Sequence, residues 1–211
     1  MEFKRKSYIE RLEGKRHNGM IKIITGLRRS GKSYLLFNLF YTHLISKGIK
    51  DDHIIRIALD DLENITLREK IALYSFIKSK ITDSQMYYCL IDEIQLANGF
   101  EEVLNSLLHI KNIDIFVTGS NSRFLVKDVI TEFRGRGDEI RLLPLSVGEI
   151  CEETDSNFEK VWAEYCMYGG LPLVQSMKDH REKSEYLKSL FSKVYLTDVI
   201  DRYKIRNKNE F

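Results

Sequence analysis

Short apolar runs alternate with longer helical patterns over the first two thirds of the chain. The runs have the length and the β-branched content of buried strands, and they lie at Met20–Thr25, His53–Leu59, Tyr87–Asp92, Ile113–Thr118 and Glu139–Leu143. Between them, helical patterns cover Lys32–Lys47, Leu67–Lys80, Phe100–His109 and Ser122–Phe133. Such alternation is typical of βαβ units. It predicts an α/β fold, with a five-stranded parallel sheet that carries helices on both faces.

The pattern changes after Pro144. Strand-like alternation stops there, and helical periodicity dominates the remaining sequence. We therefore expect three parts in the chain. These are an N-terminal helical segment over residues 1–19, an α/β domain over residues 20–144, and a small helical domain over residues 145–211.

Composition and charge narrow the class of protein. The 211 residues include 33 Lys+Arg and 31 Asp+Glu, with 43% hydrophobic residues. This composition excludes a disordered chain, and the near balance of charges does not favour nucleic acid as the main partner. The basic start, Lys4–Lys6, is expected to solvate a helix rather than to bind nucleic acid. Three cysteines without metal-ligand spacing indicate a reducing compartment. The charged N-terminus and the short uncharged stretches predict a cytoplasmic protein that does not bind membranes.

The first strand runs into a loop that matches the pattern G-x4-G-K-[ST], Gly26–Ser33, which we call the glycine loop. Its glycines allow consecutive backbone N–H groups to face phosphates, while Lys32 reaches the β- and γ-phosphates and Ser33 binds Mg²⁺. The pattern therefore predicts ATP and Mg²⁺ as ligands. The predicted nucleotide-binding residues are Gly26, Leu27, Arg28, Arg29, Ser30, Gly31, Lys32, Ser33 and Tyr34. For the two arginines, a solvated position is an equal alternative.

Two further strands end in polar residues at the same predicted edge of the sheet. Asp92 is positioned to hold Mg²⁺ through water, and Glu93 to orient a water for attack on the γ-phosphate. The alternative is that this pair only caps a helix. After the next strand, Ser120 or Asn121 could hydrogen-bond the attacking water or the γ-phosphate, or merely form a turn and a helix cap.

Four segments together resemble the prokaryotic AAA-superfamily ATPases that pair an N-terminal P-loop domain with a C-terminal domain of unknown function. They are GLRRSGKSYLL, LIDEIQLANGFEEVLNSL, VTGSNSRFLVKDVITEFRGRGDEIRLLPLSVGEI and YCMYGGLPLV. The resemblance implies a P-loop NTPase of the AAA/ASCE type with a helical lid. It implies that the strand ending at Thr118 lies between the other two, and that Asn121 or Ser120 is a sensor of the γ-phosphate.

The resemblance implies functional roles for two more segments. Arg136 occupies a position at which related proteins place an arginine finger, supplied in trans to a neighbouring subunit of a homo-oligomer. The alternative is a surface arginine in a glycine-rich loop. Gly170 and Pro172 resemble the element through which a helical lid touches the bound nucleotide, although a plain helix breaker has the same sequence.

These observations favour a Mg²⁺-dependent ATPase that switches or drives an unknown partner. Two alternatives stay open: a nucleotide-dependent signalling switch with slow or no hydrolysis, and an ATPase helper of a DNA-processing system. A small-molecule kinase fits least, because no second substrate pocket is evident. The resemblance also implies that the family continues beyond residue 211. We therefore expect a truncated chain, whose nucleic-acid or protein partner binds through the missing C-terminal region.

Overall fold

The computed structural model describes residues 2–119, 135–154 and 156–195. The chain divides into two compact units. One unit runs from Arg5 to Leu142, and the other contains Met1–Lys4 together with Leu143–Phe211. The first unit holds the sheet, and the second is helical in its described part.

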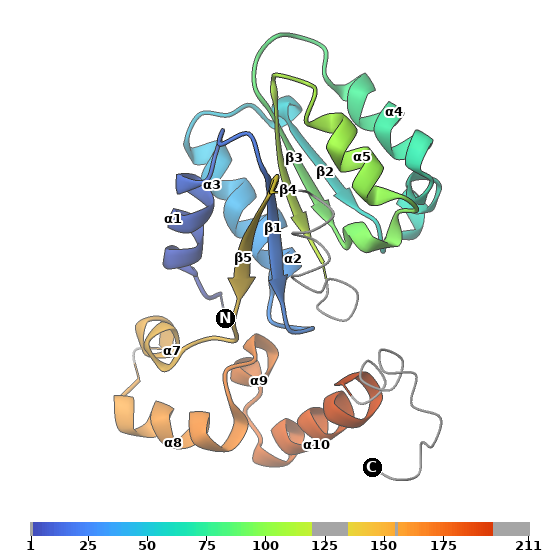
Figure 1. Cartoon of the computed structure of the whole chain (residues 1–211). Coiled ribbons are helices and arrows are strands. Elements are labelled where there is room, and N and C mark those ends of the chain that lie inside the picture. Colours follow the sequence, from blue (N-terminus) through green and yellow to red (C-terminus); the bar gives the residue numbers. More distant parts are fainter. Residues whose placement is uncertain (1, 120–134, 155, 196–211) are drawn as a thin grey trace. The chain divides into compact units, whose positions relative to one another are not determined.

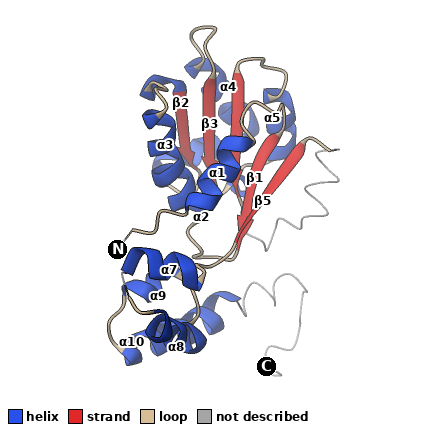
Figure 2. Ribbon diagram, turned by 90° about the vertical axis from the view of Figure 1, so that its left-hand side faces the viewer, coloured by secondary structure: helices blue, strands red, loops and turns tan. Residues whose placement is uncertain are grey.

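The sheet of the first unit has five parallel strands in the order β2-β3-β4-β1-β5. The strands are β1 (Ile21–Gly26), β2 (Ile54–Ala58), β3 (Tyr87–Asp92), β4 (Ile113–Thr118) and β5 (Gly137–Leu142). Figure 2 shows β2 and β5 at the two edges. This order confirms that the strand ending at Thr118 lies between the strand of the glycine loop and the strand of Asp92.

Helices cover both faces of this sheet, as the alternation of patterns predicts. Figure 1 shows α1, α2 and α3 on one face and α4 and α5 on the other. Their bounds are α1 (Lys6–Gly14), α2 (Lys32–Tyr34), α3 (Tyr41–Ser46), α4 (Lys70–Lys80) and α5 (Phe100–Leu107). Each face has its own apolar core, so β1 and β3 are buried along their whole length. Burial on both sides explains why these strands read as continuous apolar runs.

Two predicted helices have different bounds in the structure. A π-helical turn over Leu35–Phe40 separates α2 from α3, although the helical segment is otherwise continuous from Lys32 to Ser46. Helix α4 begins at Lys70 rather than at Leu67, because a 3₁₀ segment, Leu62–Arg68, precedes it. The helix expected over Ser122–Phe133 lies outside the described residues.

The second unit consists of short helices in its described residues. They are α7 (Val147–Thr154), α8 (Phe158–Tyr168), α9 (Pro172–Ser176), α10 (His180–Leu190) and a π-helical turn, Phe191–Tyr195. Two small apolar clusters hold them together, one around Leu145 and Ile150 and one around Val174 and Leu190. No helix in the described parts of either unit is long and apolar enough to cross a membrane.

Candidate functional site

The glycine loop turns the chain from β1 into α2 at the carboxyl edge of the sheet. A Cβ atom at Gly26 would lie 2.3 Å from the backbone oxygen of Leu142, and φ at Gly26 is +150°. No side chain fits there without moving the backbone of β5. Further along the loop, Arg29 and Gly31 have φ values of 65° and 95°. These left-handed residues bend the loop back so that the helix begins at Lys32.

Lys32 is the buried cation of the loop, with 5% of its surface exposed. Its Nζ donates hydrogen bonds to the backbone oxygens of Gly26, at 3.3 Å, and Leu27, at 3.2 Å. Burial lowers the pKa of Lys32, whereas the carboxylates of Glu93 and Asp92 raise it. The charges of the two acids thus act on the lysine across the edge of the sheet. The loop side chains that are exposed belong to Leu27, Arg28, Arg29, Ser33 and Tyr34.

Hydrogen bonds of a threonine join the carboxyl ends of strands β3 and β4. Thr118 is fully buried, and its hydroxyl donates to Oδ1 of Asp92, which is itself 3% exposed. The same hydroxyl oxygen accepts the backbone N–H of Glu93 at 3.0 Å. One side chain of β4 therefore orients the carboxylate of Asp92 and fixes the backbone that carries Glu93.

Glu93 has a left-handed backbone, with φ 51°. A non-glycine residue in this region stores strain, and such residues gather at functional sites. The conformation turns the chain sharply after β3, and the side chain of Glu93 is half-buried. Its Oε2 accepts a hydrogen bond from Nε2 of Gln95. Gln95 lies in the segment LIDEIQLANGFEEVLNSL that carries the family resemblance, but no role for its side chain was predicted.

The structure thus brings Lys32, Asp92 and Glu93 to one edge of the sheet, and it separates Arg136 from them. Arg136 is exposed and directly precedes β5, and its backbone oxygen accepts the N–H of Ile21 at 2.8 Å. It therefore lies at the amino edge of the sheet, whereas the glycine loop of the same chain lies at the carboxyl edge.

Four predicted residues are not among the described residues of the first unit. Gly170 and Pro172 belong to the helical unit. There, the N–H of Leu145 donates to the oxygen of Gly170 at 2.7 Å, and a Cβ at Gly170 would lie 2.0 Å from the oxygen of Leu145. Close packing inside this unit thus requires a glycine at position 170. Ser120 and Asn121 lie outside the described residues.

Arg5 is a site residue that sequence reasoning missed. The expectation of a solvated basic start is wrong at this position, because Arg5 is only 6% exposed. Its Nη2 donates to the backbone oxygen of Ser30 in the glycine loop, at 3.4 Å. No local signal distinguishes Arg5 from the two lysines beside it, since the contact spans 25 positions of the chain.

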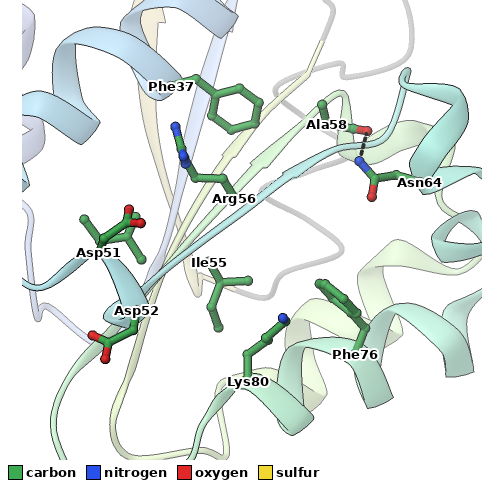
Figure 3. Close-up of a pocket in the computed structure, with 10 residues that line it drawn as sticks. Phe37, Asp51, Asp52, Ile55, Arg56, Ala58, Asn64, Phe76 and Lys80 are labelled. Atoms are coloured by element: carbon green, nitrogen blue, oxygen red, sulfur yellow. Dashed lines mark hydrogen bonds between the residues drawn. The ribbon is translucent and has the colours of Figure 1, made fainter.

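A separate hollow of about 490 Å³ runs along the open edge of β2 (Figure 3). Its floor is the strand itself, and the bond from Asn64 to the oxygen of Ala58 closes one end. Phe37 flanks it from one face of the sheet, and Phe76 and Lys80 from the other. None of the predicted site residues lines this hollow, and the exposed Arg56 in mid-strand is the kind of charge that discourages pairing with another strand.

The sequence is similar to a protein-family model and to two uncharacterized proteins. The model of a family described as "AAA domain" matches residues 18–151. An uncharacterized protein of Haemophilus influenzae is 33% identical over 209 residues, which cover 96% of this chain and 52% of that protein. An uncharacterized protein of Methanocaldococcus jannaschii is 32% identical over 206 residues, with 90% and 44% covered. The chain thus spans about half the length of the curated relatives it matches.

The chain is also similar to a solved structure. A DNA replication initiation factor has a TM-score of 0.46 and 16% sequence identity, with 97% of this chain and 65% of that chain covered.

Proposed function

This chain belongs to the AAA domain family, and from that premise we propose that it binds ATP with Mg²⁺ at the glycine loop and hydrolyses it. Turnover would switch or drive a partner that these residues do not identify. The observation that carries the proposal is the convergence of a buried lysine with two carboxylates. The charges of Asp92 and Glu93 act on Lys32 at the edge where β1 and β3 both end.

The donors and acceptors at this edge fit a magnesium nucleotide. Lys32 supplies a positive charge, and Ser30 has a buried Oγ without a hydrogen-bond partner in the described part of the chain. Ser33 and Asp92 supply the hard oxygen ligands that Mg²⁺ prefers. When bound, the ion would neutralise charge that develops on the phosphates.

Glu93 is the residue we assign to the water. Its carboxylate would accept a hydrogen bond from a water and hold it in line with the γ-phosphate. Asn121 or Ser120 would sense the γ-phosphate, and Gly170 and Pro172 would contact the nucleotide from the lid. These four assignments follow from the family resemblance.

Two substitutions test the proposal by separating binding from hydrolysis. Lys32→Ala should abolish ATP binding, because it removes the buried cation. Glu93→Gln should bind ATP normally and hydrolyse it about 10²–10⁴-fold more slowly, as expected for a lost general base. Glu102→Gln, on the exposed surface of α5, is the matched control and should leave both properties unchanged. Full turnover by Glu93→Gln would remove the catalytic assignment.

Arg136 has its own test. Because it lies at the sheet edge opposite its own glycine loop, we propose that it acts only on the site of a neighbouring copy in a homo-oligomer. Arg136→Ala should then lower turnover most at protein concentrations that favour assembly. Arg141→Ala, at an exposed position within β5, is the control. Normal turnover by Arg136→Ala at every concentration would exclude trans activation by this residue.

A slow switch is the second candidate function, and the bond from Gln95 to Glu93 favours it. A carboxylate oxygen engaged by Gln95 is less available to accept a proton from water. If the bond holds Glu93 inactive, Gln95→Ala should raise phosphate release while nucleotide affinity stays constant. Unchanged or lower turnover by Gln95→Ala would count against this restraint. The same assay, run with and without DNA, tests whether nucleic acid stimulates turnover.

A further inference from the structure

Arg5 is held at both its backbone and its side chain. Its backbone is left-handed, with φ 48° and ψ 40°, a strained conformation for an arginine. The oxygen of Arg5 accepts the N–H groups of Tyr8, at 2.9 Å, and Ile9, at 3.2 Å, so the residue is fixed to the start of α1. Its buried guanidinium, in turn, donates to the oxygen of Ser30. The strain is thus tolerated in a position that carries the side chain to the glycine loop.

The oxygen of Ser30 and the N–H of Gly31 belong to one peptide unit. The chain has no cis peptide bond in its described residues, so this oxygen and this N–H point in opposite directions. A bond that fixes the Ser30 oxygen therefore aims the Gly31 N–H away from Arg5. Within the described part of the chain, this N–H has no hydrogen-bond acceptor. Gly31 also directly precedes α2, where unpaired N–H groups favour an anion.

We propose that Arg5 is a positioning residue for phosphate binding, which fixes the Ser30–Gly31 peptide so that the Gly31 N–H faces a nucleotide phosphate. The inference rests on the proposed function of the glycine loop. A charged donor on the peptide oxygen has a second effect, because it polarises the peptide and makes its N–H a stronger donor. Arg5 thereby acts on the phosphate through the peptide and does not itself touch the ligand.

Arg11 of helix α1 provides a control for a purely structural role of Arg5. The guanidinium carbon of Arg5 lies 5.0 Å from the ring centroid of Tyr8, and that of Arg11 lies 5.5 Å from the same centroid. Both arginines therefore stack on Tyr8. Arg11 is exposed, and only Arg5 has a hydrogen bond to Ser30. Stacking on Tyr8 is shared by the two residues, whereas the contact with the loop distinguishes them.

The test compares ADP binding by wild type, Arg5→Met, Arg5→Lys, Arg11→Met and Lys32→Ala, using titration calorimetry. Arg5→Met keeps the apolar stem and loses the donor, so its affinity for ADP should fall about tenfold or more, as for a lost charged hydrogen bond. Arg5→Lys keeps a charge and should bind with intermediate affinity. Arg11→Met should bind ADP within about twofold of wild type. If Arg5→Met does not fold, Arg5→Gln, too short to reach Ser30, replaces it with the same expectation.

The amide resonance of Gly31 gives a readout that a general loss of stability would not move. In ¹H–¹⁵N spectra without nucleotide, Arg5→Met should shift the Gly31 resonance, and Arg11→Met should leave it in place. Either an unchanged ADP affinity or an unchanged Gly31 resonance in folded Arg5→Met overturns the inference. Lys32→Ala separates the two proposals. If it binds ADP as wild type does, the proposed function itself fails; if it loses binding while Arg5→Met does not, only the role of Arg5 fails.

Discussion

The hydroxyl of Thr118 links two strand ends, because it donates a hydrogen bond to Asp92 and accepts the backbone N–H of Glu93. Asp92 closes β3 and Thr118 closes β4, and these two strands are neighbours in the sheet. A single buried oxygen thus holds one carboxylate directly and positions the other through its backbone. This link between the strands depends on the sheet order, since the two residues are 26 positions apart.

Thr118→Val should impair the site without abolishing nucleotide binding. The substitution keeps the shape of the side chain, but it removes the donor to Asp92 and the acceptor of the Glu93 N–H. We expect ATP hydrolysis to fall about tenfold or more, and the free energy of unfolding to fall by about 1–3 kcal/mol. Thr118→Ser, which keeps the hydroxyl, should stay near wild type in both measurements. Thr82→Val, whose native hydroxyl contacts the hydroxyl of Tyr87 at the start of β3, serves as a control; equal effects of the two valine variants would contradict this role.

Gly26→Ala should destabilise the first unit strongly. Its new methyl group would meet a backbone oxygen of β5 at 2.3 Å, which no side-chain rotation relieves. Overpacking and backbone strain together suggest a loss of about 3 kcal/mol or more, measurable by urea unfolding. Gly14→Ala is the control, since nothing lies within 4 Å of a Cβ at that position. Equal stability of the two variants would contradict this expectation, because the backbone of β5 would then have moved to make room for the methyl group.

A buried ion pair stabilises β1 from within. Lys22 is fully buried near the start of the strand, and its Nζ donates to Asp114 of β4 and to the oxygen of Met20, at 2.8 Å. Burial lowers the pKa of Lys22, and the charge of Asp114 opposes that change. Lys22→Met should therefore cost about 3–5 kcal/mol, because it leaves the carboxylate of Asp114 buried without its cation.

The double variant Lys22→Met/Asp114→Leu tests the origin of that loss. The double variant should lose less free energy of unfolding than the two single variants together, since it leaves no buried charge without its partner. Lys70→Met breaks an exposed pair with Glu102 and should change stability by at most about 1 kcal/mol. If the two single losses simply add in the double variant, the two charges do not stabilise each other.

His53 should make the stability of the fold depend on pH. It is 6% exposed, and its ring nitrogens lie 2.5 Å from Asp52 Oδ1 and 3.1 Å from Asp83 Oδ2. The hydrogen bond with Asp52 raises the pKa of His53, and the bond with Asp83 adds to this. A raised pKa means that the folded protein binds the proton more tightly than the unfolded chain. This contribution is complete below the unfolded value, about 6.5, and is lost as the pH rises through the folded value.

The measurement is the difference in urea midpoint between wild type and His53→Gln across this pH range. The advantage of wild type should be largest near pH 6 and should shrink toward pH 9. His109→Gln, at an exposed position, should show no such trend. A wild-type advantage that is constant or grows with pH would contradict the protonated state of His53.

Local sequence patterns were sufficient to predict most of the secondary structure of the first unit. Strands β3 and β4 have the bounds that their apolar runs predict, because strands buried on both faces leave an uninterrupted signal. The glycine loop is equally local, since its residues are consecutive in the chain. The carboxyl-edge position of Asp92 also followed from the pattern, because parallel strands end at one edge. The strand order could not be predicted from periodicity. It was implied by the family resemblance.

The contacts of buried charges could not be predicted. Lys22 interrupts an apolar run, and the pattern gives it no partner, although Asp114 lies beside it in the folded sheet. Arg5 reads as one member of a basic cluster, yet it is buried against the glycine loop. In both cases the partner is more than twenty positions away, so its identity depends on which elements pack together.

The sequence by itself determined the segments that become strands, the glycine loop between β1 and α2, and the acids that end β3. These features are encoded by neighbouring residues, whose periodicity and conformational preferences act over one element. Only the tertiary structure decided that Thr118 bridges Asp92 and Glu93 and that Arg5 holds the loop at Ser30. Such contacts arise when distant elements exclude water together, and a buried polar group then takes the partner that the packing brings within reach.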